Sequence, residues 1–167
     1  MSGVADPDTL QFAQCDQAAV EALAAQLAAA APPAGILSLE GDLGAGKSTF
    51  ARAFLRSLGV TGTVRSPTYT LVEPYDIGPP GSPGRVLHLD LYRLGDPEEL
   101  DYLGVRDEFD QSLLLIEWLE RAQGVLSPDL GLSLSGDPAA PAYRDLVFRA
   151  VSPAGREWLR RLGASSG

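Results

Sequence analysis

The first half of the chain alternates between helical and strand patterns of apolar residues. Residues 16–31 are rich in alanine, and their larger apolar side chains recur at helical spacing until Pro32 ends the helix. The short apolar run 36–40 predicts a buried strand. After a glycine-rich turn at 41–46, residues 47–58 again place apolar side chains on one side of a helix. This half therefore predicts the order helix, strand, turn, helix.

The second half of the chain predicts mainly strands. Residues 68–73 and 85–92 are two candidate strands, separated by a loop at 76–84 that is rich in Pro and Gly. A loop of this length is most simply explained if the two strands are antiparallel neighbours. Within 85–92, leucines alternate with polar residues that include His88 and Asp90. The remaining elements expected are a helix beginning at Asp96, a buried strand at 113–116, a hairpin of 130–135 with 144–151, and a helix at 153–162.

Composition limits the classes of protein that these elements can build. Hydrophobic residues make up 45% of the 167 residues, so a core can form without disulfides, and the single cysteine, Cys15, excludes an intramolecular disulfide. A formal net charge of −9 argues against direct, tight binding to nucleic acid, but not against a role in a nucleic-acid pathway through a partner protein. The N-terminus lacks a signal-peptide pattern, and the most apolar stretch, 18–31, is too short to span a membrane. We therefore expect a cytoplasmic protein.

The turn between the first strand and the second helix carries the clearest chemistry. Its sequence fits G-x-x-x-x-G-K-[ST], in which backbone N–H groups and a helix N-terminus surround phosphates. The lysine reaches the β- and γ-phosphates of a nucleotide, and the hydroxyl that follows it is a ligand for Mg²⁺. This phosphate-binding loop, or P-loop, comprises Gly41, Asp42, Leu43, Gly44, Ala45, Gly46, Lys47 and Ser48. We expect it to bind ATP with Mg²⁺.

Several sequence blocks together resemble one family, TsaE (formerly YjeE), the P-loop ATPase of tRNA threonylcarbamoyladenosine synthesis. The resemblance covers about 35–118. Its blocks are 41–49 (GDLGAGKST), 66–75 (SPTYTLVEPY), 88–94 (HLDLYRL), 96–100 (DPEEL) and 116–118 (IEW). It departs from the family mainly at Ser48, where the family more often has Thr; either hydroxyl can bind Mg²⁺. The resemblance adds Thr49 to the expected nucleotide-binding residues.

The resemblance also implies partners. It implies a bacterial protein that works with two others, TsaD and TsaB, of which TsaD transfers the threonylcarbamoyl group to adenosine 37 of tRNA. ATP binding and hydrolysis by a TsaE protein support the turnover of that complex. Contact with tRNA is then only indirect, through the complex.

Three residues outside the P-loop are candidates for the catalytic and metal sites. Glu117 ends an apolar run, as the acid of a Walker B strand does, and we expect it to bind Mg²⁺. Asp90 lies opposite a leucine face and could orient water on Mg²⁺ or the attacking water. From the residues alone, Thr68 fits a nucleotide-sensing loop and an ordinary turn equally well; the resemblance favours the nucleotide-sensing loop. The expected metal ligands are Ser48, Asp90 and Glu117.

Other functions remain compatible with a P-loop. One is a nucleotide-gated assembly clamp in which hydrolysis is incidental. Another is a small-molecule kinase, although the adjacent arginines Arg160 and Arg161 lie in the terminal helix and make a poor phosphate lid. A GTPase is disfavoured, because its N-K-x-D motif needs an asparagine and a second lysine that the chain lacks.

The fold class follows from these elements. We predict one P-loop ATPase domain over residues 1–167, ending in a flexible tail at 163–167. Its architecture is expected to be a three-layer α/β P-loop NTPase fold, with a mixed sheet in which antiparallel pairs flank a parallel centre.

Overall fold

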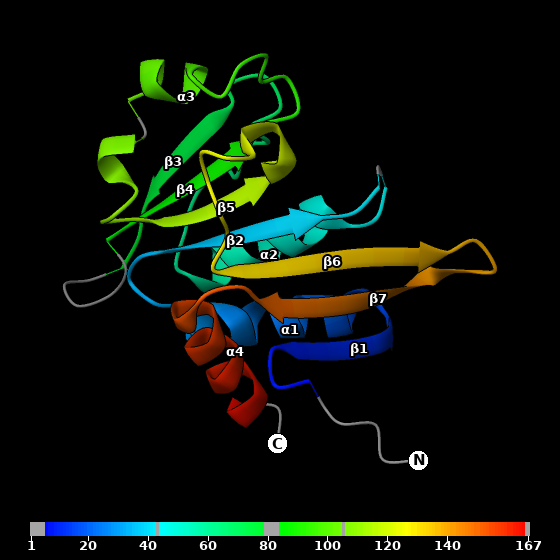
Figure 1. Cartoon of the computed structure of the whole chain (residues 1–167). Coiled ribbons are helices and arrows are strands. Elements are labelled where there is room, and N and C mark those ends of the chain that lie inside the picture. The colour runs from blue at the N-terminus through cyan, green and yellow to red at the C-terminus, as the bar shows by residue number, and fades with distance from the viewer. Residues whose placement is uncertain (1–5, 43, 79–83, 105, 166–167) are drawn as a thin grey trace.

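A seven-stranded mixed sheet runs through the molecule (Figure 1). The computed structural model describes residues 6–42, 44–78, 84–104 and 106–165. The strand order is β1-β7-β6-β2-β5-β4-β3. The strands are β1 (Thr9–Cys15), β2 (Gly35–Glu40), β3 (Val72–Asp76), β4 (Arg85–Asp90), β5 (Leu113–Glu117), β6 (Leu130–Asp137) and β7 (Ala140–Ala150). The four central strands β6, β2, β5 and β4 are parallel, and antiparallel pairs flank them. The predicted mixed sheet is therefore confirmed.

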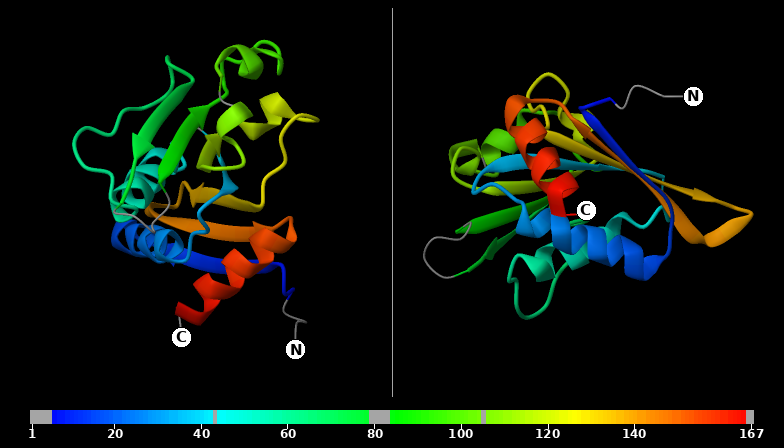
Figure 2. Two further views of the ribbon diagram at one scale, coloured as in Figure 1. Left: turned by 90° about the vertical axis from the view of Figure 1, so that its left-hand side faces the viewer. Right: turned by 90° about the horizontal axis from the view of Figure 1, so that it is seen from below.

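The longer helices cover one face of this sheet. They are α1 (Gln17–Ala29), α2 (Lys47–Ser57) and α4 (Pro153–Ser165) (Figure 2). The Asp16 side chain caps α1 by accepting a hydrogen bond from the Ala19 N–H at 2.8 Å. The Ser152 hydroxyl caps α4 by accepting one from the Gly155 N–H at 3.0 Å. No helix in the described part of the chain has the length and apolar character needed to cross a membrane.

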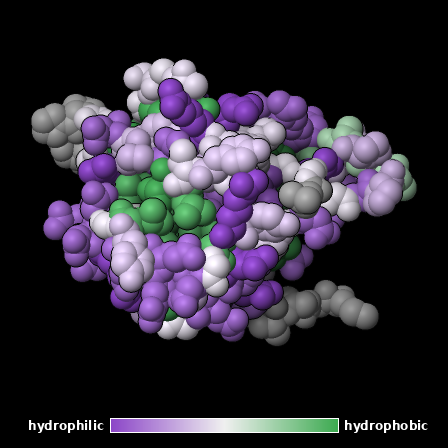
Figure 3. All heavy atoms as spheres, turned by 90° about the horizontal axis from the view of Figure 1, so that it is seen from above, coloured by the Kyte–Doolittle hydropathy of each residue, from purple (hydrophilic) through white to green (hydrophobic). Residues whose placement is uncertain are grey.

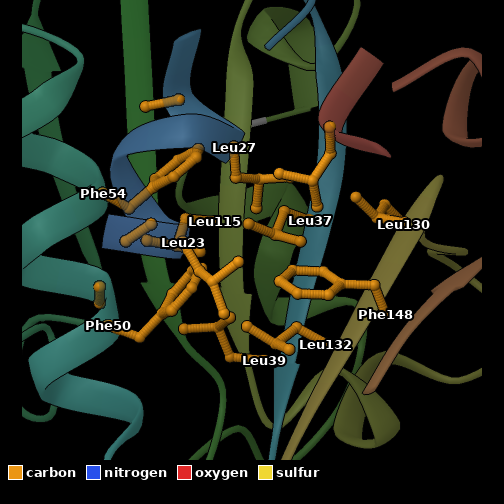
Figure 4. Packing of buried hydrophobic residues seen from close by; sticks show 14 of the residues in the cluster. Leu23, Leu27, Leu37, Leu39, Phe50, Phe54, Leu115, Leu130, Leu132 and Phe148 are labelled. Atoms are coloured by element: carbon orange, nitrogen blue, oxygen red, sulfur yellow. The ribbon is translucent and has the colours of Figure 1, made fainter. Parts of the chain in front are cut away.

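The main core lies between these helices and the sheet. Figure 4 shows leucines of β2, β5 and β6 pointing toward aromatic and leucine side chains of the helices. Leu27, Phe54 and Phe148 have no exposed surface. Burying one such side chain contributes about 1.5–3 kcal/mol to the free energy of unfolding. The Trp158 indole N–H, also buried, donates to the Leu27 carbonyl at 3.0 Å and so ties α4 to α1.

Short helices cover part of the second face. α3 (Glu99–Tyr102) and η2 (Leu119–Ala122) bury apolar side chains in a second cluster that includes Leu87, Leu89 and Ile116 of the sheet. A further short helix is η1 (Arg106–Glu108). Viewed from above, a patch of apolar side chains lies among hydrophilic ones (Figure 3). Leu87, Leu89 and Leu91 all belong to the buried second cluster, which confirms the leucine face predicted for residues 85–92.

The structure corrects three element predictions. The strand expected at 68–73 begins only at Val72, because residues 67–70 form a turn closed by the Leu71 N–H bonded to the Pro67 carbonyl. The helix expected at Asp96 begins at Glu99, after a turn in which the Asp96 carboxylate accepts from the Glu98 N–H. β1 was not predicted as a strand at all.

Part of the predicted tail at 163–167 is helical instead. α4 continues to Ser165. A side chain at Gly163 would lie 3.7 Å from Leu10 of β1, an ordinary contact distance. Residues 166–167, most of the predicted 76–84 loop and Leu43 of the P-loop lie outside the described part of the chain.

Candidate functional site

The P-loop joins the carboxyl end of β2 to the amino end of α2. Gly41 has a φ of +152°, and a Cβ atom there would lie 2.6 Å from the Leu134 carbonyl oxygen, so this position requires glycine. The Lys47 ammonium donates to the Gly41 carbonyl at 2.7 Å, and only 7% of Lys47 is exposed. The lysine side chain therefore folds back along the loop that the sequence predicted to bind phosphates.

Arg144 of β7 holds this loop from the other side. Its Nε donates to the Ala45 carbonyl at 3.1 Å, and its Nη2 donates to the Gly44 carbonyl at 3.2 Å. Two further hydrogen bonds, to the Pro141 and Tyr143 carbonyls, fix the guanidinium. Sequence reasoning missed Arg144, because this residue lies 99 residues from Ala45 and belongs to no motif.

The predicted acids lie beside the P-loop. Asp90 ends β4 and Glu117 ends β5, and the parallel register pairs these two residues directly. Asp90 is 8% exposed and Glu117 is 7% exposed. The carboxyl ends of parallel strands are where α/β sheets bind ligands. β2, β5 and β4 thus bring the P-loop and both acids to one edge.

The turn that contains Thr68 lies against this edge. The Thr68 hydroxyl donates to Asp90 Oδ2 at 3.5 Å, which is a long hydrogen bond, and lies 2.7 Å from the Ser66 hydroxyl. The other carboxylate oxygen, Oδ1, accepts from the Tyr92 N–H at 3.0 Å. Asp90 therefore links the turn to the sheet.

Glu117 and its neighbour Trp118 line the same space as Lys47 and Thr68. Glu117 Oε2 lies 3.0 Å from His88 Nε2, and both side chains are buried. Trp118 has a φ of +61°, and this left-handed backbone turns its ring under the Lys47 ammonium, which lies 4.3 Å from the ring centroid. Tyr92 packs against the same indole ring with centroids 4.9 Å apart.

These groups surround one cavity of about 530 Å³. Among the residues predicted from sequence, its lining comprises Gly44, Gly46, Lys47, Ser48, Thr49, Thr68, Asp90 and Glu117. Gly41, Asp42 and Ala45 line an adjacent cavity of about 410 Å³, whose other walls come from β6, β7 and the turn between them. A third cavity, of about 360 Å³, shares Gly46, Thr49 and Arg144 with the first. Predicted residues from four separate segments therefore meet at one site.

The oxygen atoms of this cavity suit a hard cation. Within the described residues there is no group of three or more His, Cys, Asp or Glu side chains placed to hold a metal ion. Mg²⁺ does not need such a group, because it takes one or two carboxylates and completes its octahedron with water and phosphate oxygens. Ser48, Asp90 and Glu117 are a donor set of this kind, and they line the same cavity.

The sheet and the loop together define the class of protein. A mixed α/β sheet, with a G-x-x-x-x-G-K-S loop between its central strand and a helix, is the P-loop NTPase fold. The sequence profile described as "Threonylcarbamoyl adenosine biosynthesis protein TsaE" matches residues 15–142. The chain belongs to the TsaE family.

Individual relatives agree with this assignment. The chain is 54% identical over 90 residues to the Haemophilus influenzae protein named tRNA threonylcarbamoyladenosine biosynthesis protein TsaE, a match that spans 53% of this chain and 54% of that one. The Bacillus subtilis protein of the same name is 38% identical over 135 residues, covering 78% and 79%. The crystal structure of YdiB from Bacillus subtilis superimposes with a TM-score of 0.75 at 29% identity, covering 95% of this chain and 97% of that one.

Proposed function

We propose that this chain is the ATP-binding and ATP-hydrolysing component of the bacterial machinery that makes N6-threonylcarbamoyladenosine at position 37 of tRNA. One observation carries the proposal. The P-loop lysine, the Thr68 turn and two buried carboxylates line a single cavity at the carboxyl edge of the sheet. Such an arrangement places cations and oxygen ligands around a triphosphate, which is what phosphoryl transfer to water requires.

The phosphates would lie at the amino end of α2. There the Lys47 ammonium can leave the Gly41 carbonyl for the β- and γ-phosphates, and the first N–H groups of the helix face the same space. Ser48, Asp90 and Glu117 would hold Mg²⁺, which would neutralise part of the negative charge of the phosphates. Both carboxylates are less than a tenth exposed, and a cation bound between them would offset the cost of burying their charge.

Hydrolysis would proceed by attack of a water molecule. The water oxygen forms a bond to the γ-phosphorus while the bond from that phosphorus to the β,γ-bridging oxygen breaks, giving ADP and inorganic phosphate. Asp90 or Glu117 orients the water by accepting a hydrogen bond from it. Thr68 bonds to Asp90, so the turn at 67–70 would lie close enough to contact the γ-phosphate and respond to its loss.

The adenosine would occupy the cavity of about 360 Å³. This cavity continues from the phosphate cavity past Gly46 and Thr49. Val20, Leu134 and Pro141 give it apolar walls, and Arg144 stands where the two cavities meet. An apolar slot with a few polar groups is typical of base-binding sites.

The pathway and partners rest on the family. The relatives are named for tRNA threonylcarbamoyladenosine biosynthesis. We propose TsaD and TsaB as partners whose turnover this protein supports. Contact with tRNA is indirect, since the chain carries a formal charge of −9. One continuous sheet joins both halves of the chain, which supports a single ATPase domain.

ATP turnover tests the proposal. The purified protein is assayed alone and with the TsaD–TsaB pair, with Lys47→Ala as the blank and Arg160→Ala as a charge-matched control on the exposed side of α4. We expect slow turnover alone, faster turnover with the pair, and loss only in Lys47→Ala. Tight ATP binding without any response to the pair would refute the partner-stimulated ATPase.

A second assay separates the ATPase from an assembly clamp. Asp90→Ala and Glu117→Ala should still bind ATP but lose the modification of tRNA if hydrolysis is needed. Full modification by a variant that no longer hydrolyses ATP would favour the clamp. Phosphate transfer to a metabolite would instead favour a kinase.

A further inference from the structure

His88 is buried beside the proposed metal site and bonds directly to one of its acids. The residue is 3% exposed and lies on β4, two positions before Asp90. In the parallel register it pairs with Leu115, so its side chain shares a sheet face with Glu117. Its Nε2 lies 3.0 Å from Glu117 Oε2. The imidazole of His88 therefore contacts the Glu117 carboxylate directly.

The chemistry of the two groups fixes the direction of this hydrogen bond. A carboxylate only accepts, so the shared proton belongs to His88 Nε2. The other ring nitrogen, Nδ1, is buried and has no hydrogen-bond partner in the described part of the chain. In this ring, the one hydrogen bond that the structure gives goes to Glu117.

Glu117 needs such a partner to act as a ligand. Its side chain has several rotatable bonds, and a free carboxylate in a cavity of about 530 Å³ could turn away from the P-loop. The bond to His88 holds Oε2 and leaves Oε1 for the cavity. His88 also lines a small void of about 40 Å³ between Ser48 of α2 and Ser66 of the turn segment. It therefore stands between the two elements that approach the phosphates.

We propose that His88 is a positioning residue, which orients Glu117 toward Mg²⁺ through the Nε2 hydrogen bond. This inference rests on the proposed function, since it assumes that Glu117 meets Mg²⁺ bound with a nucleotide. Groups that hold a metal ligand in place typically change metal affinity by about 10–100-fold when they are removed. His88 acts through Glu117 and does not touch the nucleotide.

Two substitutions separate positioning from packing. In His88→Gln, the amide nitrogen falls near the place of Nε2 and can donate to Glu117. In His88→Asn, the same amide falls near the place of Nδ1 and cannot reach. Calorimetric binding of ADP is measured with Mg²⁺ and with EDTA, because the ratio of the two affinities isolates the metal.

We expect His88→Asn to reduce this ratio by about 10–100-fold, while binding in EDTA stays as in the natural sequence. His88→Gln should recover most of the ratio. Equal ratios in all three proteins, or equal losses in both variants, would overturn the inference. If the unaltered protein itself shows no Mg²⁺ effect, the proposed metal site fails instead.

A spectroscopic measurement tests the hydrogen bond itself. His88 is the only histidine in the chain, so a long-range ¹H–¹⁵N spectrum shows one imidazole. A proton on Nε2, with a ring signal that moves in Glu117→Gln and on addition of Mg²⁺ with ADP, supports positioning. An unprotonated Nε2, or a ring signal unaffected by Glu117→Gln, contradicts it.

Discussion

Gly41 allows a precise test of how the P-loop is built, through the substitution Gly41→Ala. The new Cβ atom would lie 2.6 Å from the Leu134 carbonyl oxygen and 3.0 Å from Ala45 Cβ. The first contact is with backbone of β6, which cannot rotate away as a side chain could. The loop would have to move off the strand, and Lys47 would lose its place on the Gly41 carbonyl.

The cost of this change has two parts. A non-glycine residue at positive φ costs about 1–2 kcal/mol, and overpacking against fixed atoms typically costs about 1–3 kcal/mol. Together they lower the free energy of unfolding by about 3 kcal/mol, which corresponds to a fall in Tm of roughly 6–12 °C for a chain of this size. Nucleotide affinity should also fall, because the P-loop would move away from its phosphate-binding position.

Gly62→Ala is the matched control. Gly62 also has a positive φ, +80°, but nothing lies within 4 Å of its Cβ position. It should show only the backbone part, about 1–2 kcal/mol. Urea unfolding without nucleotide measures both variants, since bound ligand would add stability of its own. If Gly41→Ala lies within about 0.5 kcal/mol of the control, the close approach to Leu134 does not constrain the loop.

Three further outcomes are expected. Nucleotide binding should change tryptophan fluorescence through Trp118, because its ring lies under Lys47. The change should persist in Trp158→Phe, which alters the buried core tryptophan, and should vanish in Trp118→Phe. The reverse result would contradict the proposed nucleotide site. Leu27→Ala should lower the free energy of unfolding by about 2–5 kcal/mol in a urea titration, because Leu27 is fully buried; a loss below 1 kcal/mol would contradict the packing. The Arg160 guanidinium lowers the pKa of Glu157 to about 2. The unaltered protein should therefore be more stable than Glu157→Gln above the ordinary pKa of 4.5, and this difference should disappear as the pH falls toward 2. An NMR titration of Glu157 with a midpoint near 4.5 would refute this.

Local signals in the sequence were enough to predict the central strands of the sheet. β2, β4 and β5 are short apolar or alternating runs, and their ends carry the P-loop, Asp90 and Glu117. Parallel strands that follow one another place their carboxyl ends at one edge, so the meeting of these residues follows from the chain order. The main part of the candidate site was predictable for this reason.

Tertiary contacts decided the parts that sequence did not predict. Residues 68–71 have strand-like composition, but the chain turns there, with the Leu71 N–H bonded to the Pro67 carbonyl and Leu71 at a positive φ. β1 is an edge strand whose register depends on β7, which lies near the other end of the chain. Arg144 reaches the P-loop only because that same β7 packs beside β6.

His88 and Trp118 show a second kind of limit. In the sequence, His88 alternates with leucines and Trp118 follows a buried strand, and both patterns are typical of packing residues. Both do pack, yet each also contacts a residue of the candidate site, Glu117 or Lys47. A sequence pattern indicates which face a side chain occupies, but not which atom it meets there.

The backbone at Trp118 has a consequence for protein engineering. A φ of +61° and ψ of +43° cost a tryptophan about 1–2 kcal/mol, and glycine would remove that cost. Glycine would also remove the indole ring from beneath Lys47. A search for thermostable variants guided by backbone geometry alone would therefore select a substitution that removes one wall of the nucleotide cavity. Position 118 should be held fixed when this chain is stabilised for structural or biotechnological use.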